Sequence, residues 1–358
     1  MIPKIEFIYS KEYDDVFREL WYLSNTSWSK YVSDEISIQK YINEKIKPEW
    51  KIYEDMILTK IAEIWIYKRT ETIIPIYIIW KATWLWSWTS KPMTIWVIKK
   101  PELIIDIITH ELIHHYLDLW WKNIIDYYKL SNINYKSDNN TVIHIILYAM
   151  QYYIYKDIPK QWEYTLEILN KQNANYNWFI NKAKEIWFEK IINDYQNFVE
   201  KNKQVLFNSK YPILRFPDAN SYSLVFKKII NLKKNNNNLN ISRNEIEEFK
   251  KIYFQKKYKL LSKIPKIISI ITNIQWNHKF IYINIVSYNS YDINIPMTIG
   301  LYNNEDKIEQ LTIKKIIKYF IYFHKKELQI YLDKNNFSEE EFEIYISQEI
   351  EKELSIFP

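Results

Sequence analysis

Apolar residues recur at intervals of three and four along three long segments of the chain. These segments are residues 38–64 (IQKYINEKIKPEWKIYEDMILTKIAEI), 101–119 (PELIIDIITHELIHHYLDL) and 141–155 (TVIHIILYAMQYYIY). This spacing lines one face of a helix with apolar side chains, so we predict a helix at each place. Two shorter apolar runs, IIPIYIIW at 73–80 and PMTIWVIK at 92–99, have the length and composition of buried strands.

The second half of the chain repeats the order strand, strand, helix of the first half. The segment IPMTIGLY at 295–302 resembles KPMTIWVI at 91–98, an apolar strand precedes each segment, and a helical pattern follows each. We therefore predict a tandem duplication, with one domain at residues 1–203 and a second copy at residues 204–358.

The chain contains a single glycine, Gly300, and 15 tryptophans among its 358 residues. Ordinary usage of about 7% would give roughly 25 glycines in a chain of this length, and turns and helix C-caps need them. The tryptophans stand where glycines are expected. Trp120 and Trp121 follow a predicted helix, and Trp96 aligns with Gly300 in the repeat. We hypothesise that the gene uses UGA for glycine and that this sequence was translated with UGA as tryptophan.

The alternative is a protein that is truly rich in tryptophan, and single positions such as Trp50 could be tryptophan under either interpretation. If the tryptophans are glycines, residues 80–88 (WKATWLWSW) form a flexible loop between the two strands rather than an aromatic platform for substrate. Trp65 and Trp187 would then be glycines that end helices, and Trp276 would lie in a turn.

Composition narrows the class of protein further. The chain has no cysteine, which excludes disulfides and thiolate metal sites. Its net charge of +6 is spread along the sequence, whereas a nucleic-acid partner would require a concentrated basic face. The apolar runs are too short to span a bilayer, and the N-terminus shows no signal peptide. We therefore expect a cytoplasmic protein without a nucleic-acid partner or a membrane span.

Residues 110–114 read HELIH, a complete HExxH motif within a predicted helix. Positions i and i+4 lie on one helix face, so His110 and His114 can both offer imidazole nitrogens to one zinc ion. Glu111 falls beside them, close enough to accept a proton from a zinc-bound water. A surface helix with clustered histidines is the alternative. Ile107 and Leu112 are among the apolar residues that disfavour it, because they indicate a helix that is buried on much of its circumference.

Over roughly residues 70–120, this motif and the strands before it resemble the zincin metallopeptidases. The resemblance implies an α+β domain in which the HExxH helix packs under a small sheet and holds a zinc cofactor. It further implies hydrolysis of a peptide or protein substrate, with Glu111 as the general base and an edge strand, at 92–98 or 74–79, that binds substrate in extended form. The metzincin subgroup does not fit, because Leu117 and Trp120 occupy the positions of its glycine and third histidine.

A third zinc ligand must therefore come from a later element. His144, about 30 residues downstream on an otherwise apolar helix, is the first candidate, although a lone histidine there is also typical of a core. The gluzincin pattern would instead supply a glutamate, and Glu163 or Glu167 would serve. Asp118 is a weaker candidate. His115 lies one residue off the ligand face and either orients another group or meets solvent.

Two further residues share the helix face of His144. Tyr148 and Gln151 follow it at i+4 and i+7, so either could touch substrate, although a tyrosine there is more typical of a core.

The second copy lacks an HExxH motif. Its helix reads TIKKIIKYFIYFHKKEL, and matching its apolar positions to those of the first copy puts Tyr319 and Phe323 where the histidines stand. His324 alone cannot hold a catalytic zinc, and we assign no role to His278. We interpret this half as a degenerate copy that acts as a scaffold or covers a substrate groove. The leading prediction is a zinc metallopeptidase, and the alternative is a zincin scaffold that binds or regulates a partner without cutting it.

Overall fold

The computed structural model describes most of the chain, in two compact units. The described residues are 3–24, 35–65, 73–79, 89–90, 93–96, 101–117, 139–172, 180–184, 186–202, 213–215, 257, 260–276, 280–286, 296, 298–300 and 305–355. Unit 1 comprises Met1–Pro3, Ser33–Arg69 and Trp88–Asn208, and unit 2 comprises Lys4–Val32, Thr70–Ser87 and Ser209–Pro358. Helices dominate and the strands are short, so the fold is α+β. Both units are discontinuous in sequence, and the proposed division after residue 203 stays a prediction.

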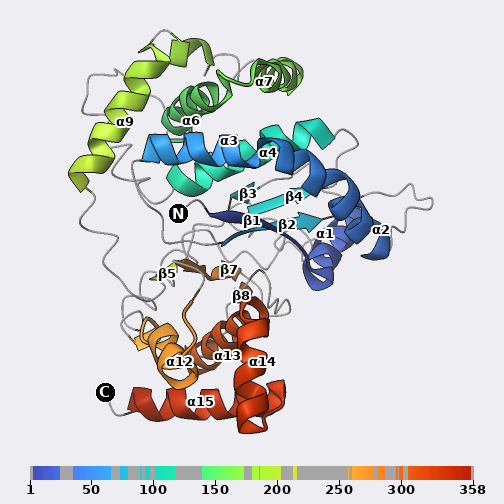
Figure 1. Cartoon of the computed structure of the whole chain (residues 1–358), viewed down its shortest axis with the longest axis vertical. Coiled ribbons are helices and arrows are strands. Elements are labelled where there is room, and N and C mark those ends of the chain that lie inside the picture. Colours follow the sequence, from blue (N-terminus) through green and yellow to red (C-terminus); the bar gives the residue numbers. More distant parts are fainter. Residues whose placement is uncertain are drawn as a thin grey trace. The chain divides into compact units, whose positions relative to one another are not determined.

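Unit 1 is a set of helices with one short strand pair (Figure 1). In β3 and β4, which run antiparallel, Thr89 lies opposite Thr94 and Ser90 lies opposite Met93. The expected edge segment at 92–98 contains β4, and β3 pairs with one of its edges. The elements of unit 1 are α2 (Glu35–Tyr41), the π-helical turn η1 (Ile42–Ile46), α3 (Lys47–Trp65), β3 (Thr89–Ser90), β4 (Met93–Trp96), α4 (Pro101–Leu117), α6 (Asn139–Tyr155), α7 (Pro159–Gln172) and α9 (Phe188–Asn202).

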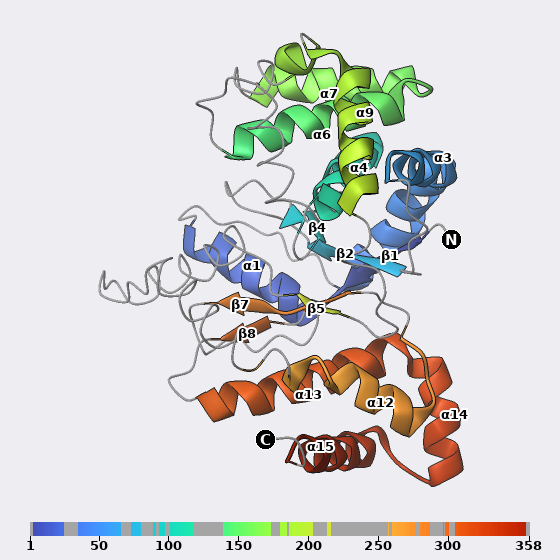
Figure 2. The same ribbon diagram turned by 90° about the vertical axis from the view of Figure 1, so that its left-hand side faces the viewer.

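The central element of unit 1 is α4, the helix that carries the HELIH segment. It contacts α3, α6 and α7 as well as β3 and β4, so neighbours surround most of its circumference (Figure 2). Ile104, Ile108 and Leu112 have no exposed surface. An apolar stripe that extends around a helix is typical of such a buried position. By contrast, α9 covers α6 from outside and buries only one face, through Ile191 and Tyr195.

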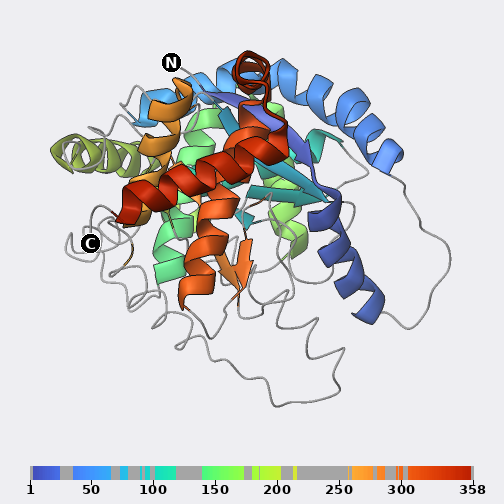
Figure 3. The same cartoon turned by 90° about the horizontal axis from the view of Figure 1, so that it is seen from below.

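Unit 2 combines three parallel strand pairs with α1 and a group of C-terminal helices, which lie together in orange to red in Figure 3. In the longest pair, β1 and β2 align from Lys4 opposite Ile73 to Tyr9 opposite Ile78, and β5 pairs with β6 and β7 with β8. The elements of unit 2 are β1 (Lys4–Tyr9), α1 (Lys11–Ser24), β2 (Ile73–Ile79), β5 (Ile213–Arg215), α12 (Ile264–Thr272), β6 (Phe280–Tyr282), β7 (Asn284–Val286), β8 (Thr298–Gly300), α13 (Glu305–Phe323), α14 (Lys325–Asn335) and α15 (Glu339–Ser355).

The core of unit 2 forms around α13. Ile316, Ile317 and Phe320 are fully buried there, together with Phe342 and Ile346 of α15. The same core includes residues of α12 and α14, so it joins all the C-terminal helices.

Local capping fixes the turn from α14 to α15. Asn336 adopts a left-handed conformation with φ of 53°, and the backbone N–H of Phe337 donates to the carbonyl of Leu332, as in a Schellman motif. Ser338 and Glu341 then form a reciprocal capping box. The Ser338 N–H donates to Glu341 Oε2 at 2.8 Å, and the Glu341 N–H donates to Ser338 Oγ at 3.2 Å.

The element lengths offer a second alignment of the two halves, beside the one expected from the apolar positions. Pro101 begins α4 five residues after Trp96, and Glu305 begins α13 five residues after Gly300, so the segments align without a gap. In this register the lysines 314, 315 and 318, rather than Tyr319 and Phe323, correspond to the histidines and glutamate of HELIH. The correspondence agrees in burial, because Lys315 and its counterpart Glu111 are each 2% exposed.

Candidate metal centre

Two neighbouring helices bring three histidines of unit 1 together. Positions i and i+4 of α4 put His110 and His114 one turn apart, with their ring centroids 4.9 Å from each other. Helix α6 contacts α4 and adds His144, whose ring centroid lies 6.0 Å from that of His110 and 5.2 Å from that of His114. The apolar faces of α4 and α6 pack together at this point, and the three imidazoles lie close to one another.

The nitrogen atoms of these three rings can point to one position. One ligand atom of each ring lies within 4.8 Å of the others, and no other group of three histidines or carboxylates in the described part of the chain meets the same criterion. Zinc with three histidine ligands keeps a fourth, open position for water or substrate. The three histidines could therefore hold a metal ion.

Burial keeps the imidazole of His110 in the form that binds metals. Burial and, to a smaller extent, the nearby charge of His144 together lower the pKa of His110 from 6.5 to about 3, although Gln151 acts to raise it. At neutral pH the His110 ring is therefore uncharged and has a free lone pair on one nitrogen, which metal coordination requires.

Glu111 is enclosed in the same region of α4. Its side chain is 2% exposed, and burial raises its pKa from 4.5 to about 8. Without a nearby cation the carboxyl group is mostly protonated at pH 7. A divalent cation beside it would favour the carboxylate again, because an opposite charge at short range lowers the pKa of an acid.

A buried polar network adjoins the histidines. Asp106 lies one turn before His110 on α4, and its Oδ1 accepts hydrogen bonds from Gln151 of α6, at 2.7 Å, and from Thr165 of α7. Burial raises the pKa of Asp106 to about 7, although these donors and Tyr155 act to lower it. The sequence carries a signal for Asp106, which is a lone charge in the apolar run LIIDII. The pairing of α6 with α7 that brings in Thr165 leaves no comparable signal.

The other residues considered as ligands lie elsewhere. Glu163 and Glu167 are exposed on α7 and do not belong to the histidine cluster. Asp118 lies outside the described residues, as does the loop at 80–88. His115 is 6% exposed, so it is buried rather than facing solvent.

Tyr148 and Gln151 differ in their distance from the cluster. Tyr148 is buried with its ring centroid 5.8 Å from that of His110 and 6.3 Å from that of His144, so it lines the cluster. Gln151 is fully buried and engaged with Asp106, which argues against the expectation that it touches substrate.

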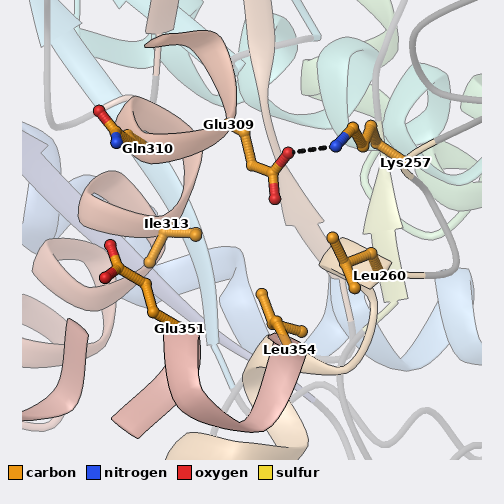
Figure 4. Close-up of a pocket in the computed structure, with 7 residues that line it drawn as sticks. All are labelled: Lys257, Leu260, Glu309, Gln310, Ile313, Glu351 and Leu354. Carbon is orange, nitrogen blue, oxygen red and sulfur yellow. Dashed lines mark ion pairs between the residues drawn. The ribbon is translucent and has the colours of Figure 1, made fainter. Parts of the chain in front are cut away.

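Unit 2 contains a different kind of pocket, between α13, α15 and the segment around residue 257 (Figure 4). Lys257 and Glu309 form an ion pair of 2.6 Å on one side, and apolar side chains form much of the remaining wall. His324 is not part of this wall. It is buried against Phe320 and Trp276, with ring centroids 4.7 and 5.8 Å away. The described lining of the pocket therefore offers carboxylates but no histidine, in contrast to the cluster in unit 1.

Comparisons with protein-family models, with curated proteins and with solved structures gave no match. Among the described residues, every helix is either too short or too polar to cross a membrane. The site chemistry is therefore the basis for assigning a function.

Proposed function

We propose that this protein is a zinc-dependent peptidase of the zincin type. The observation that carries the proposal is the convergence of His110, His114 and His144 from two helices, with Glu111 enclosed next to them. Three imidazoles and one carboxyl group match the donor set and the general base that this chemistry needs.

Each residue has a distinct task in the proposed reaction. The three histidines would hold zinc, which lowers the pKa of a coordinated water toward 7 and polarises a substrate carbonyl. Glu111 precedes Leu112 on the buried side of α4, and its carboxylate oxygens would accept the proton that the attacking water loses. The same carboxyl group would then pass this proton to the nitrogen of the departing amine. Its apolar surroundings strengthen these electrostatic interactions by excluding bulk water.

The proposal extends to the architecture. The HExxH helix with β3 and β4 beside it would be the zincin-like part of the chain, and the sequence β7, β8, α13 would be its degenerate repeat. A lysine, Lys315, at the position of the general base would leave the second copy without peptidase chemistry. Its role would then be structural or regulatory.

The direct test compares the purified wild-type protein with the variant Glu111→Gln on an unstructured substrate such as casein. We expect hydrolysis that a chelator abolishes, and a rate about 100- to 10,000-fold lower in Glu111→Gln, because general acid–base catalysis contributes that much. Zinc content should be unchanged in the variant, since the glutamate is not a ligand. Equal rates in the two proteins would refute the role of Glu111. Bound zinc without hydrolysis of any tested peptide would favour the alternative of a non-catalytic binding protein.

A further inference from the structure

Gln151 belongs to a polar network that the proposed reaction does not use. Its side chain is fully buried on α6, seven residues after His144. It meets Asp106 of α4 and Thr165 of α7, so three helices of unit 1 contribute to the network. Asp106 and Thr165 are 6% and 1% exposed, which means that bulk water does not satisfy these groups.

The network fixes which way the Gln151 amide points. Its Nε2 donates to Asp106 Oδ1 at 2.7 Å and lies 3.5 Å from Thr165 Oγ1. The Thr165 hydroxyl donates to the same Oδ1. Because two donors converge on Oδ1, this oxygen acts as an acceptor and the amide NH2 faces Asp106. The amide oxygen, Oε1, must then point to the opposite side.

Helix geometry places His110 next to this amide. Asp106 and His110 stand one turn apart on the same face of α4, so an amide held by the first lies beside the second. His144, whose ring centroid lies 6.0 Å from that of His110, shares its face of α6 with Gln151, which follows it by two turns. Gln151 Oε1 is itself buried and makes no hydrogen bond of ordinary geometry with any described residue. A buried acceptor next to an imidazole is therefore available for its ring N–H.

We propose that Gln151 is a positioning residue for the metal ligand His110. Its Oε1 accepts the hydrogen on the ring nitrogen that does not bind the metal, which fixes the tautomer and the plane of the imidazole. Asp106 and Thr165 hold the amide in the orientation that makes this possible. Histidines that bind metals commonly donate their second N–H to such an acceptor, and losing it weakens metal binding. The inference rests on the proposed function, because it assumes a metal at the three histidines.

The test measures the zinc dissociation constant by competition with a chromogenic chelator. Gln151→Leu should bind zinc about 10- to 100-fold more weakly than the wild type, because the imidazole loses its acceptor. The matched control is Gln161→Leu. Gln161 is a fully buried glutamine on α7 whose side-chain oxygen and nitrogen also lack described partners. Its side chain makes no hydrogen bond to the described histidines, so its replacement should leave the dissociation constant unchanged.

A second variant separates positioning from folding. In D106N/Q151E the amide donor lies at position 106 on α4, and the carboxylate acceptor lies at position 151 on α6. A side-chain oxygen of position 151 therefore still faces His110. The zinc affinity of this double variant should be closer to that of the wild type than to that of Gln151→Leu. Thermal unfolding without zinc provides the comparison, because a purely structural role would lower the unfolding temperature and leave the dissociation constant as it was.

The outcomes distinguish this inference from the proposed function. If Gln151→Leu folds and binds zinc within about twofold of the wild type, the positioning role is refuted while the metal site stands. If Gln151→Leu does not fold, D106N/Q151E provides the test. A zinc affinity of this double variant as weak as that of a variant lacking one of the three histidines refutes the positioning role. If the wild type binds no zinc, the proposed function and this inference fall together. Zinc binding without peptide hydrolysis removes only the peptidase assignment.

Discussion

Trp187 adopts a backbone conformation that is unfavourable for a residue with a Cβ. Its φ is 71°, and the side chain is 73% exposed directly before α9. The left-handed region costs roughly 1–2 kcal/mol for a residue with a Cβ and little for glycine. Trp187 is one of the positions where the sequence favours glycine, so its conformation supports the UGA hypothesis at this site. Trp276 does not support it, because its Nε1 donates to the carbonyl of Pro265 at 2.8 Å.

Replacing these two tryptophans should therefore have opposite effects. Trp187→Gly should raise the free energy of unfolding by about 1 kcal/mol, since it relieves the left-handed strain and removes few contacts. Trp276→Gly should lower it by roughly 3 kcal/mol or more, because the ring packs on Phe320. Urea denaturation measures both. Destabilisation by Trp187→Gly would count against glycine at that position, and TGG codons at all 15 tryptophans would end the hypothesis.

Single residues also show how much of the candidate site can be predicted from the sequence. His110, Glu111 and His114 follow from one motif, and His144 follows from the oddity of a polar ring on an apolar helix. The contact of Gln151 with Asp106 could not be predicted. It depends on how α4, α6 and α7 pack, and the spacing within a helix does not contain that information.

At the scale of elements, apolar periodicity locates helices well but misses their interruptions. The segment 38–64 is helical as predicted, with a π-helical turn at η1 between α2 and α3. In the second half, the predicted helix breaks at His324, whose φ of −118° and ψ of 22° separate α13 from α14. The apolar pattern continues on both sides of this break. A pattern of period 3.6 therefore cannot reveal it.

His324 is buried at this break, so the free energy of unfolding of unit 2 should depend on pH. Burial lowers the pKa of His324 from 6.5 to about 4, so between these values the unfolded chain binds a proton that the folded chain does not. Stability should fall as the pH decreases from 6.5 to 4, by up to about 1.4 kcal/mol per pH unit from this residue. The variant His324→Leu removes this contribution. Urea denaturation across that range should show a shallower slope in the variant, and parallel slopes would contradict the assignment.

The capping box before α15 should contribute measurably to stability. Ser338→Ala removes the Oγ that accepts from the Glu341 N–H, and it should lower the free energy of unfolding by about 1 kcal/mol. Ser347→Ala is the matched control on the same helix. The Ser347 hydroxyl only donates to the carbonyl of Glu343, so its loss should have little effect. Thermal unfolding distinguishes the two, and equal effects would show that the cap is not the cause.

At the scale of the whole molecule, the α+β class could be predicted from the sequence but the membership of the two units could not. The segments 4–32 and 70–87 belong to the same unit as the C-terminal part. They meet because β1 and β2 pair in parallel, which requires a long connection and leaves no local trace in the sequence. The repeated PMTI segment shows where two similar elements lie, and it says nothing about such pairing.

Metal binding should stabilise the folded protein as a whole. A ligand that binds only the folded state adds about 2.7 kcal/mol at a concentration 100 times its dissociation constant. We expect the unfolding temperature to fall when a chelator removes zinc, and to recover when zinc is added back. The variant His144→Ala should unfold at the same temperature with and without the chelator. A wild-type unfolding temperature that does not change when the chelator is added would argue against a bound metal.

The zinc content of the purified protein tests the central claim most directly. Elemental analysis should find one zinc per chain in the wild type and in the variants Glu163→Ala and Glu167→Ala, whose side chains are exposed on α7. It should find almost none in His110→Ala, His114→Ala and His144→Ala, because each loses one of three ligands. A wild-type protein without zinc, or one zinc per chain in His144→Ala, would contradict the three-histidine centre.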